Sequence, residues 1–538
     1  MTEAIRLNNV SLAIGDAAIL DGVNFALREG EITGLIGRSG SGKSMTALAM
    51  MGLAPRAAQI TGDIMIDGEN VLSMNERTLC DVRGRKIAMV FQEPMTALNP
   101  LQTIGAQIAE TFLTHQKISR DEAMERAKTA LVRAGLPPEE VSPDRRPHEL
   151  SGGQRQRAVI AIAIAMKPKV LIADEPTTAL DVTTQAEILE LLKSLAKEDG
   201  CALLLITHDL AVVSHISDRI AVMKEGRIVA DESADEFYAH ADAALAREFI
   251  PARVKRDAIA PGAEIALKAE DISCDYINAR RSLFSEPSVF RAVHNASFNI
   301  MKGETLGLVG ESGCGKSTLA KALLGLHPVA EGCASIGGEG FPARDKAAMR
   351  RLRRKIQIVF QDPYSSFNPR QRIADILAEP LHLFDTPMTQ DEQRARAAML
   401  IESVGLDKTA LDKHPHAFSG GQRQRIAIAR ALATEPEVIV LDEATSALDI
   451  ASRNHILELL QSLSASRDVS FLFITHDLSV IRDIADRVLV MKDGQIVETG
   501  ETDHIFAKPE NDYTKRLIAA APVIRWRHKA GETAGDEK

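Results

Sequence analysis

The sequence predicts an α/β protein that consists of two successive domains with the same fold. One set of short motifs occurs twice along the chain, in the same order and with closely matching spacing. Ser419 follows Ser151 by 268 residues (419 − 151 = 268), and Glu443 follows Glu175 by the same distance (443 − 175 = 268). In each copy, short apolar runs alternate with helical patterns, which is typical of a parallel sheet buried on both faces. A duplicated domain explains both observations.

The elements of each copy follow a common order. Alternating apolar and polar residues predict a first strand over 5–14 and again over 265–273. An apolar run then leads into a glycine-rich loop and a helix rich in Ala, Leu and Met. A mainly helical insert is expected at about 93–150 in the first copy and about 362–418 in the second. After the insert, runs such as VLIAD and ALLLIT are expected to be strands in the interior of the sheet.

The predicted domain boundaries lie where this periodicity stops. We expect a first domain over 1–250, a linker over 251–264, a second domain over 265–522 and a polar tail over 523–538. Pro, Gly and mixed charges interrupt every pattern in the linker. The end of the tail is polar, which is typical of a disordered segment.

Composition excludes several classes of protein. The net charge of −10 gives no basic footprint for nucleic acid. The five cysteines show no Cys-x-x-Cys spacing, which argues against a disulfide framework, a zinc site or an iron–sulfur cluster. The first residues contain no apolar signal segment, and no apolar run approaches the ~18 residues that a membrane span needs. We therefore expect a cytosolic chain that acts at a membrane only through partners.

The glycine-rich loops GRSGSGKS and GESGCGKS predict two phosphate-binding sites for ATP. Glycines let successive backbone amides turn inward, and the following helix presents its positive N-terminus. The alternative is a simple glycine turn before a helix. The occurrence of the same loop pattern at matching places in both copies argues against this alternative. The lysines are expected to neutralise the β- and γ-phosphates, and the final serines to bind Mg²⁺. The predicted binding residues are Gly37, Ser39, Gly40, Gly42, Lys43 and Ser44, and Gly310, Ser312, Gly313, Gly315, Lys316, Ser317 and Thr318.

An acidic pair ends one apolar run in each copy. Asp174 and Asp442 are predicted to bind Mg²⁺, and the adjacent Glu175 and Glu443 to polarise the attacking water. Paired acids at a strand end can also be solvated turn residues, but these follow four apolar residues and precede a repeated Ala-Leu-Asp.

A histidine follows a later apolar run in each copy. His208 and His476 both stand in the sequence Ile-Thr-His-Asp. They are predicted to contact the γ-phosphate and to orient the water, because a lone structural histidine would not recur at an identical offset.

The Ser-Gly-Gly-Gln motif predicts a second anion-binding surface at a helix start. Since the phosphates of its own copy already have a loop, the motif is expected to serve the other copy. This reasoning predicts two composite sites. The first loop would act with Ser419, Gly420, Gly421 and Gln422, and the second with Ser151, Gly152, Gly153 and Gln154.

With these motifs in place, the chain resembles the ATP-binding cassette (ABC) ATPases, whose six motifs it matches twice. The resemblance implies that each domain has a RecA-like parallel-sheet core, an antiparallel β subdomain and a helical subdomain. It also implies nucleotide contacts by Gln92, Gln361, Asp181 and Asp449, with both glutamines on Mg²⁺ as well. The stretches QEPMTALNP, QDPYSSFNP and YTKRLIAAAP, and Pro-His-x-x-Ser-Gly-Gly-Gln-Arg-Gln-Arg in both copies, are similar to the oligopeptide and dipeptide importer subfamily, here in a fused form.

What the resemblance implies is an ATPase that drives import of peptides or peptide-like solutes. Two integral-membrane permease subunits would dock near 92–100 and 361–369, and a periplasmic solute-binding protein would act indirectly. The chain would lie on the cytoplasmic face of a bacterial inner membrane. A soluble twin cassette that acts on ribosomes or DNA is the alternative, but the short linker and the lack of zinc modules argue against it. A non-enzymatic scaffold would lack the glutamates or histidines that are present.

The two copies differ at the place where cassette relatives stack the adenine. The second copy offers Tyr276 in the strand before its phosphate loop, whereas the first has Ile14. Tyr276 could instead only pack in the sheet. Two further departures are Ala444 in place of the proline seen at Pro176, and Leu245 at the offset of Tyr513.

Overall fold

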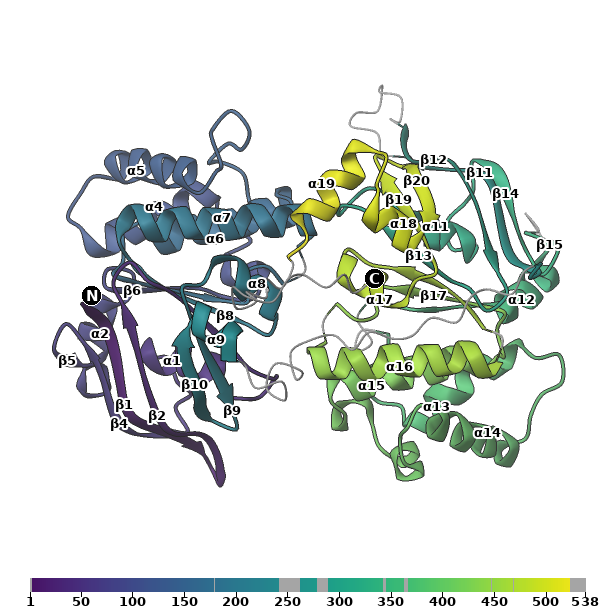
Figure 1. The fold of residues 1–538 in the computed structure, drawn as a ribbon, viewed down its shortest axis with the longest axis horizontal. Helices are drawn as coiled ribbons and strands as arrows, with labels where there is room; N and C mark the ends of the chain where they lie inside the picture. Colours follow the sequence, from purple (N-terminus) through teal and green to yellow (C-terminus); the bar gives the residue numbers. More distant parts are fainter. Residues whose placement is uncertain are drawn as a thin grey trace. The chain divides into compact units, whose positions relative to one another are not determined.

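The computed structural model describes residues 2–178, 180–240, 262–277, 289–341, 345–361, 366–446, 448–467 and 469–522. The chain divides into two compact units (Figure 1): the first holds most of the described residues up to 240, and the second holds those over 262–521. Most of the predicted linker, over 251–261, and the whole polar tail over 523–538 lie outside the described residues. So do Leu245 and the alanines of both Ala-Leu-Asp motifs.

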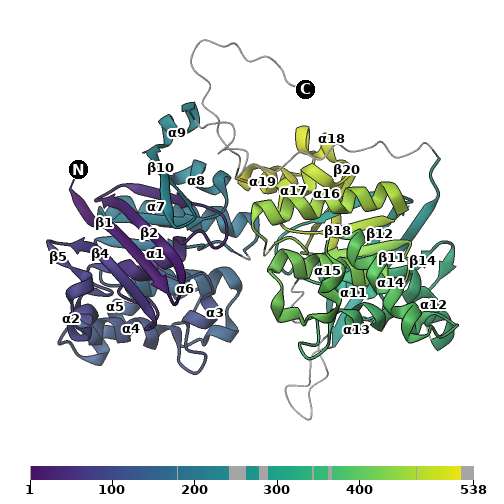
Figure 2. The same cartoon turned by 90° about the horizontal axis from the view of Figure 1, so that it is seen from below.

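Each unit contains a four-stranded antiparallel sheet, as expected for the β subdomain. In the first unit the strand order is β2-β1-β4-β5, with Ile5 of β1 opposite Ile66 of β4. Figure 2 shows β1, β2 and β4 side by side. The order in the second unit is β12-β11-β14-β15. The strands are β1 (Glu3–Ile14), β2 (Ala17–Arg28), β4 (Ala58–Ile66) and β5 (Glu69–Asn70), and β11 (Ile265–Ile277), β12 (Val289–Met301), β14 (Glu331–Ile336) and β15 (Glu339–Gly340).

A six-stranded sheet forms the centre of each unit. The strand orders are β10-β9-β3-β8-β7-β6 and β16-β17-β18-β13-β19-β20, and all neighbours are parallel except the last hairpin, β9–β10 or β19–β20. The strands are β3 (Ile32–Ile36), β6 (Ile87–Val90), β7 (Val170–Asp174), β8 (Ala202–Thr207), β9 (Arg219–Lys224) and β10 (Arg227–Ser233), and β13 (Thr305–Val309), β16 (Ile356–Val359), β17 (Val438–Asp442), β18 (Ser470–Ile474), β19 (Arg487–Lys492) and β20 (Gln495–Glu501). The α/β fold predicted from the sequence is confirmed.

Helices pack against these sheets, and in the second unit α15 also contacts α16. The helices of the first unit are α1 (Lys43–Met50), α2 (Glu76–Val82), α3 (Pro94–Ala97), α4 (Ile104–His115), α5 (Arg120–Arg133), α6 (Gly152–Ile164), α7 (Val182–Asp199), α8 (Leu210–Ile216) and α9 (Ala234–His240). Those of the second are α11 (Lys316–Leu323), α12 (Lys346–Lys355), α13 (Ile373–Ala378), α14 (Gln390–Ser403), α15 (Gly420–Leu432), α16 (Ile450–Arg467), α17 (Leu478–Ile484), α18 (Thr502–Ala507) and α19 (Asp512–Ala520). Short 3-10 turns span Val71–Ser73, Pro147–Glu149, Glu379–Leu383, Lys408–Asp412 and Pro415–Ala417.

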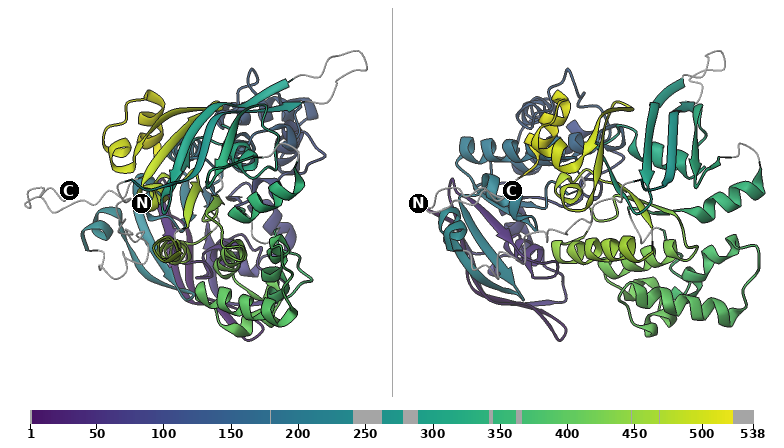
Figure 3. Two further views of the ribbon diagram at one scale, coloured as in Figure 1. Left: turned by 90° about the vertical axis from the view of Figure 1, so that its right-hand side faces the viewer. Right: turned by 45° about the vertical axis from the view of Figure 1, so that its right-hand side comes forward.

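Strand β7 shows why the interior strands read as unbroken apolar runs. Val170 and Ile172 point into a core shared with the antiparallel sheet, whereas Leu171 and Ala173 point into a core shared with the insert helices. Successive side chains of a strand face opposite sides, so a strand that is covered on both faces needs apolar residues at every position. Figure 3 shows the antiparallel sheet of the second unit as a separate layer from its parallel sheet. The acid that follows such a run is therefore held at the carboxyl edge of the parallel sheet.

Among the described residues, no helix combines the length and the apolar character that crossing a membrane requires.

Candidate functional site

Each glycine-rich loop curls around its own lysine. Lys43 donates hydrogen bonds from Nζ to the carbonyl oxygens of Gly37 at 2.7 Å and Arg38 at 3.0 Å. Lys316 makes the same contacts in the second unit, to Gly310 at 2.7 Å and to Glu311 at 2.8 Å. Both lysine side chains are buried. The positive charge that the sequence predicts for each loop is therefore present and held by loop carbonyls.

Glycine is required in these loops for two reasons. Gly42 and Gly315, which cap helices α1 and α11, have φ values of 107° and 106°, a conformation that other residues rarely adopt. At Gly310 a Cβ atom would lie 2.1 Å from the carbonyl oxygen of Met491. The repeated glycines are thus fixed by backbone conformation and by the close approach of the neighbouring strand.

Asp174 and Asp442 are the last residues of β7 and β17, beside the first turn of the loop helices. Burial raises the pKa of Asp174, and a hydrogen bond from Ser44 opposes that rise. Its Oδ1 atom is buried without a hydrogen-bond partner among the described residues. In the second unit Ser317 Oγ lies 3.3 Å from Asp442 Oδ1.

The donor set at each strand end fits Mg²⁺. A buried carboxylate beside a hydroxyl supplies the hard oxygen ligands that Mg²⁺ prefers, and this ion commonly takes its remaining ligands from water and substrate phosphates. No cluster of three or more His, Cys, Asp or Glu side chains that could hold a metal occurs in the described ranges. The carboxylate and the hydroxyl at each strand end are thus two oxygen groups of the kind that Mg²⁺ binds.

Glu175 lies directly after β7 and receives three side-chain hydrogen bonds. Gln92 Nε2 donates to Oε2 at 2.8 Å, Thr178 Oγ1 donates to the same oxygen at 3.1 Å, and His208 Nδ1 lies 3.1 Å from Oε1. Burial pushes the pKa of Glu175 up, but the contacts with His208 and Thr178 and the charge of Lys43 outweigh it, so the pKa is lowered. The residue is thus held as a carboxylate.

The second unit repeats this arrangement around Glu443. Gln361 Nε2 donates to Oε2 at 2.7 Å, and His476 Nδ1 lies 3.3 Å from Oε1. Again burial raises the pKa of Glu443, and the contact with His476 overcomes it, leaving the pKa below its usual value. Both glutamates have a left-handed φ, 46° at Glu175 and 50° at Glu443, which is a strained conformation for a non-glycine residue. Neither this strain nor the contact between the glutamine and the glutamate could be predicted from the motifs.

The Ser-Gly-Gly-Gln motifs begin helices α6 and α15. Ser151 Oγ accepts from the amide of Gln154 at 3.2 Å, while Gln154 Oε1 accepts from the amide of Ser151 at 3.0 Å. Ser419 and Gln422 form the same reciprocal pair. This is a capping box, so both side chains fix the helix start. The serines and the first glycines of both motifs remain exposed at that positive helix end.

Asp181 and Asp449 stand just before α7 and α16. Asp449 accepts hydrogen bonds from the amide of Ser452 at 2.9 Å and from its hydroxyl at 3.2 Å, so it caps α16. Asp181 directly precedes α7, which begins at Val182.

Tyr276 lies near the end of β11, beside the start of the loop helix. Its hydroxyl is 3.3 Å from Thr318 Oγ1, and its ring packs against His327 with 4.6 Å between ring centroids. The side chain is 38% exposed, so one part of the ring is open to solvent. Ile14 occupies the last position of β1 in the first unit.

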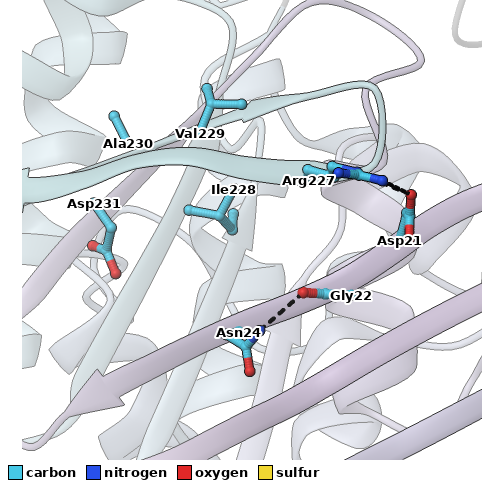
Figure 4. Close-up of a pocket in the computed structure, with 8 residues that line it drawn as sticks. All are labelled: Asp21, Gly22, Asn24, Arg227, Ile228, Val229, Ala230 and Asp231. Atoms are coloured by element: carbon cyan, nitrogen blue, oxygen red, sulfur yellow. Dashed lines mark hydrogen bonds and ion pairs between the residues drawn. The ribbon is translucent and has the colours of Figure 1, made fainter.

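A groove of about 480 Å³ lies between β2 and β10 in the first unit, away from these motifs (Figure 4). Arg227 Nε pairs with Asp21 at 2.9 Å across one end of the groove. None of the residues that the sequence predicts for nucleotide binding lines it. The lining residues are Asp21, Gly22, Asn24, Arg227, Ile228, Val229, Ala230 and Asp231.

Comparison with known proteins identifies relatives over nearly the whole chain. A family model described as ABC transporter matches residues 20–178 and 293–446. The peptidoglycan transport ATP-binding protein YejF of Agrobacterium fabrum is 43% identical over 93% of this chain and 92% of its own length. The glutathione import ATP-binding protein GsiA of Escherichia coli is 42% identical over 94% of this chain and 87% of its own length. Among solved structures, cbiO1 of Clostridium perfringens is 28% identical, with a TM-score of 0.40 over 46% of this chain and 92% of that one.

Proposed function

Because this chain belongs to the ABC transporter family, with two ATP-hydrolysing domains in one polypeptide, we propose that it drives the uptake of peptides or peptide-like solutes into a bacterial cell. The observation that carries the proposal is similarity over more than nine-tenths of this chain to two ATP-binding proteins, one named for peptidoglycan transport and one for glutathione import. The alternative, action on ribosomes or DNA, is not favoured by these relatives. We also propose the domain boundaries 1–250 and 265–522, with 251–264 as the linker.

We propose that each phosphate loop holds the β- and γ-phosphates of ATP. Its amides and its lysine, Lys43 or Lys316, would bind the phosphate oxygens. Ser44 with Asp174, and Ser317 with Asp442, would hold Mg²⁺, and Gln92 and Gln361 would reach the same ion. Held there, the ion would supply positive charge that offsets the charge developing on the phosphoryl group during transfer. The unpartnered Asp174 Oδ1 supports this assignment.

The hydrolytic step is assigned to the glutamates and histidines. Glu175 and Glu443 would accept a hydrogen bond from the attacking water and take its proton as the water oxygen bonds to the γ-phosphorus. The bond from the γ-phosphorus to the β–γ bridging oxygen would break in the same step, and ADP would leave. His208 and His476 would orient that carboxylate and contact the γ-phosphate. Support comes from the lowered pKa values of both glutamates, which keep the carboxylates ionised near neutral pH.

We further propose that the two sites are composite. The motif over 419–422 would complete the site of the first loop, and the motif over 151–154 would complete the site of the second. ATP would then join the two domains, and hydrolysis would release them. The serines and first glycines of both motifs are exposed at the positive starts of α6 and α15, which supports this proposal.

Replacing Ser419 with alanine tests the composite arrangement. Hydrolysis at the site of Lys43 should fall about tenfold, because one hydrogen bond to a charged phosphate is lost. Hydrolysis at the site of Lys316 should change little. Site-resolved trapping of a photoreactive nucleotide distinguishes the two sites, and Ser151→Ala should give the mirror-image pattern. Loss at the site of Lys316 with Ser419→Ala would show that each motif serves its own copy.

Replacing Tyr276 with alanine tests the adenine contact. If the exposed ring stacks on the base, affinity for ATP at the second site should fall roughly tenfold, since base stacking contributes about 1–3 kcal/mol. Ile14→Tyr should raise affinity at the first site. Phe290→Ala removes a neighbouring exposed ring opposite Tyr276 and is the matched control. Unchanged affinity in both Tyr276→Ala and Ile14→Tyr would assign Tyr276 to packing alone.

The partners follow from the same family. We propose that two integral-membrane permease subunits dock near 92–100 and 361–369, that a periplasmic binding protein supplies the solute, and that the chain lies on the cytoplasmic face of the inner membrane. Exposed apolar side chains near the first of these segments support a docking role. Phe91, Met95 and Leu101 are 39%, 51% and 81% exposed, and such side chains often mark an interaction surface. Residues 362–365 of the second segment lie outside the described ranges.

A further inference from the structure

Helix α19 contacts the second phosphate loop through one tyrosine. The hydroxyl of Tyr513 accepts a hydrogen bond from the backbone amide of Glu311 at 3.0 Å, although 202 positions separate them in sequence. Glu311 is the second residue of the loop, and its carbonyl oxygen accepts the hydrogen bond of Lys316 at 2.8 Å. Tyr513 therefore holds the same residue on which the loop lysine rests.

The tyrosine is itself held firmly. Its side chain is 5% exposed and belongs to the core of the second unit, together with Leu517 one helical turn later. The Nζ atom of Lys492 lies 5.3 Å from the centre of the ring. Burial raises the pKa of Tyr513, so the group stays a neutral hydroxyl at physiological pH. Packing in the core fixes the position of the Tyr513 ring. The hydroxyl group then contacts the backbone of the loop.

The start of α19 is fixed to the central sheet. The carboxylate of Glu498, on β20, accepts hydrogen bonds from the amides of Glu510 at 2.7 Å and Asn511 at 3.2 Å. Asn511 then caps the helix by accepting from the amide of Tyr513 at 2.8 Å. These contacts form a continuous path from β20 through the helix start to the phosphate loop.

The first copy has apolar residues at the two positions that match Glu498 and Tyr513. Ala230 stands at the offset of Glu498 (498 − 230 = 268), and Leu245 stands at the offset of Tyr513 (513 − 245 = 268). Neither side chain can form the corresponding hydrogen bond. Leu245 lies outside the described residues, but its side chain has no hydroxyl in any conformation. The residues at these two offsets in the first copy therefore cannot reproduce the contacts of Glu498 and Tyr513.

We propose that Tyr513 is a positioning residue for the second phosphate loop, so that nucleotide binding in the second copy depends on α19 whereas binding in the first does not. The inference rests on the proposed function of the loop. Phosphate binding needs several loop amides in a fixed arrangement, and a hydrogen bond that fixes one peptide before ATP arrives lowers the entropy lost on binding. The two sites of one chain thereby differ in what stabilises them.

The test replaces Tyr513 with phenylalanine in the full-length chain, which removes the hydroxyl and keeps the ring. Binding of a fluorescent MgATP analogue is measured in two backgrounds: Lys43→Ala, where the second loop remains, and Lys316→Ala, where the first remains. Affinity should fall about threefold to tenfold in the first background and stay unchanged in the second. Tyr238→Phe is the matched control, because Tyr238 is a tyrosine of the first copy that is 8% exposed. It should change neither affinity.

A second readout separates positioning from general stability. In the absence of nucleotide, hydrogen exchange at the amide of Glu311 should speed up in Tyr513→Phe while the unfolding temperature stays the same. Equal affinity and equal exchange in Tyr513→Phe and the unmodified chain would overturn the role of Tyr513 alone. If adding Lys316→Ala to Lys43→Ala did not weaken binding further, the nucleotide site itself would be overturned, and with it the role of Tyr513.

Discussion

Changing both Glu175 and Glu443 to glutamine should lower the rate of ATP hydrolysis by a factor of about 10²–10⁴, the usual contribution of a positioned general base. Glutamine keeps the shape of the side chain and can still meet the glutamine and histidine that contact it, but it cannot take a proton from water. ATP binding should persist, because the phosphate loops are unchanged. Each single variant should keep part of the activity, since the other copy retains its glutamate.

Steady-state phosphate release, measured with the permease complex, checks this prediction. The matched control is Glu139→Gln with Glu458→Gln, two exposed glutamates, one in each copy and neither within the motifs of the site. That control should hydrolyse ATP at the normal rate. Normal turnover in Glu175→Gln with Glu443→Gln would mean that neither residue activates the water.

Replacing Lys43 or Lys316 with alanine should weaken ATP binding at the altered loop by about 1.5–3 kcal/mol, or roughly tenfold to a hundredfold in affinity. The lysine offers the buried positive charge of the loop, and its removal also leaves the loop carbonyls without their donor. For the first loop those carbonyls belong to Gly37 and Arg38. The loss should be larger than for any other single side chain of the loop.

Isothermal calorimetry with MgATP measures this effect for each variant. Lys321→Ala removes an exposed lysine from the same helix as Lys316 and should bind ATP normally. If Lys316→Ala also bound ATP with unchanged affinity, the second glycine-rich loop would have to be reassigned as a structural turn.

The fold could be predicted because its signals are local. In β7 the residues alternate between two cores, so both faces demand apolar side chains and the strand is visible as a run. The glycines of the phosphate loops are also local, since a left-handed φ at Gly42 and Gly315 leaves little choice of residue. The position of Asp174 directly after this apolar run then predicted that it lies at the end of the strand.

The side-chain contacts at the site could not be predicted in the same way. The hydrogen bond from Gln92 to Glu175 joins residues 83 positions apart. The backbone of Glu175 also has a left-handed φ, which is uncommon for a glutamate. The contact of Tyr513 with Glu311 depends on how helix α19 packs against the second unit. No sequence motif near either residue predicts that packing. The capping boxes of α6 and α15 have a known pattern, serine followed three residues later by glutamine, which the anion-binding interpretation of the motif overlooked.

The number of ATP molecules that one chain binds tests the central claim most directly. Equilibrium dialysis of the Glu175→Gln, Glu443→Gln chain with MgATP avoids loss of the ligand by hydrolysis. Two complete sites predict two bound ATP molecules per chain. At an MgATP concentration too low to fill a loop weakened about tenfold to a hundredfold, the number should fall towards one with either Lys43→Ala or Lys316→Ala. A single ATP per chain, lost entirely in one lysine variant and unaffected in the other, would contradict the account, because one of the two copies would then hold no nucleotide.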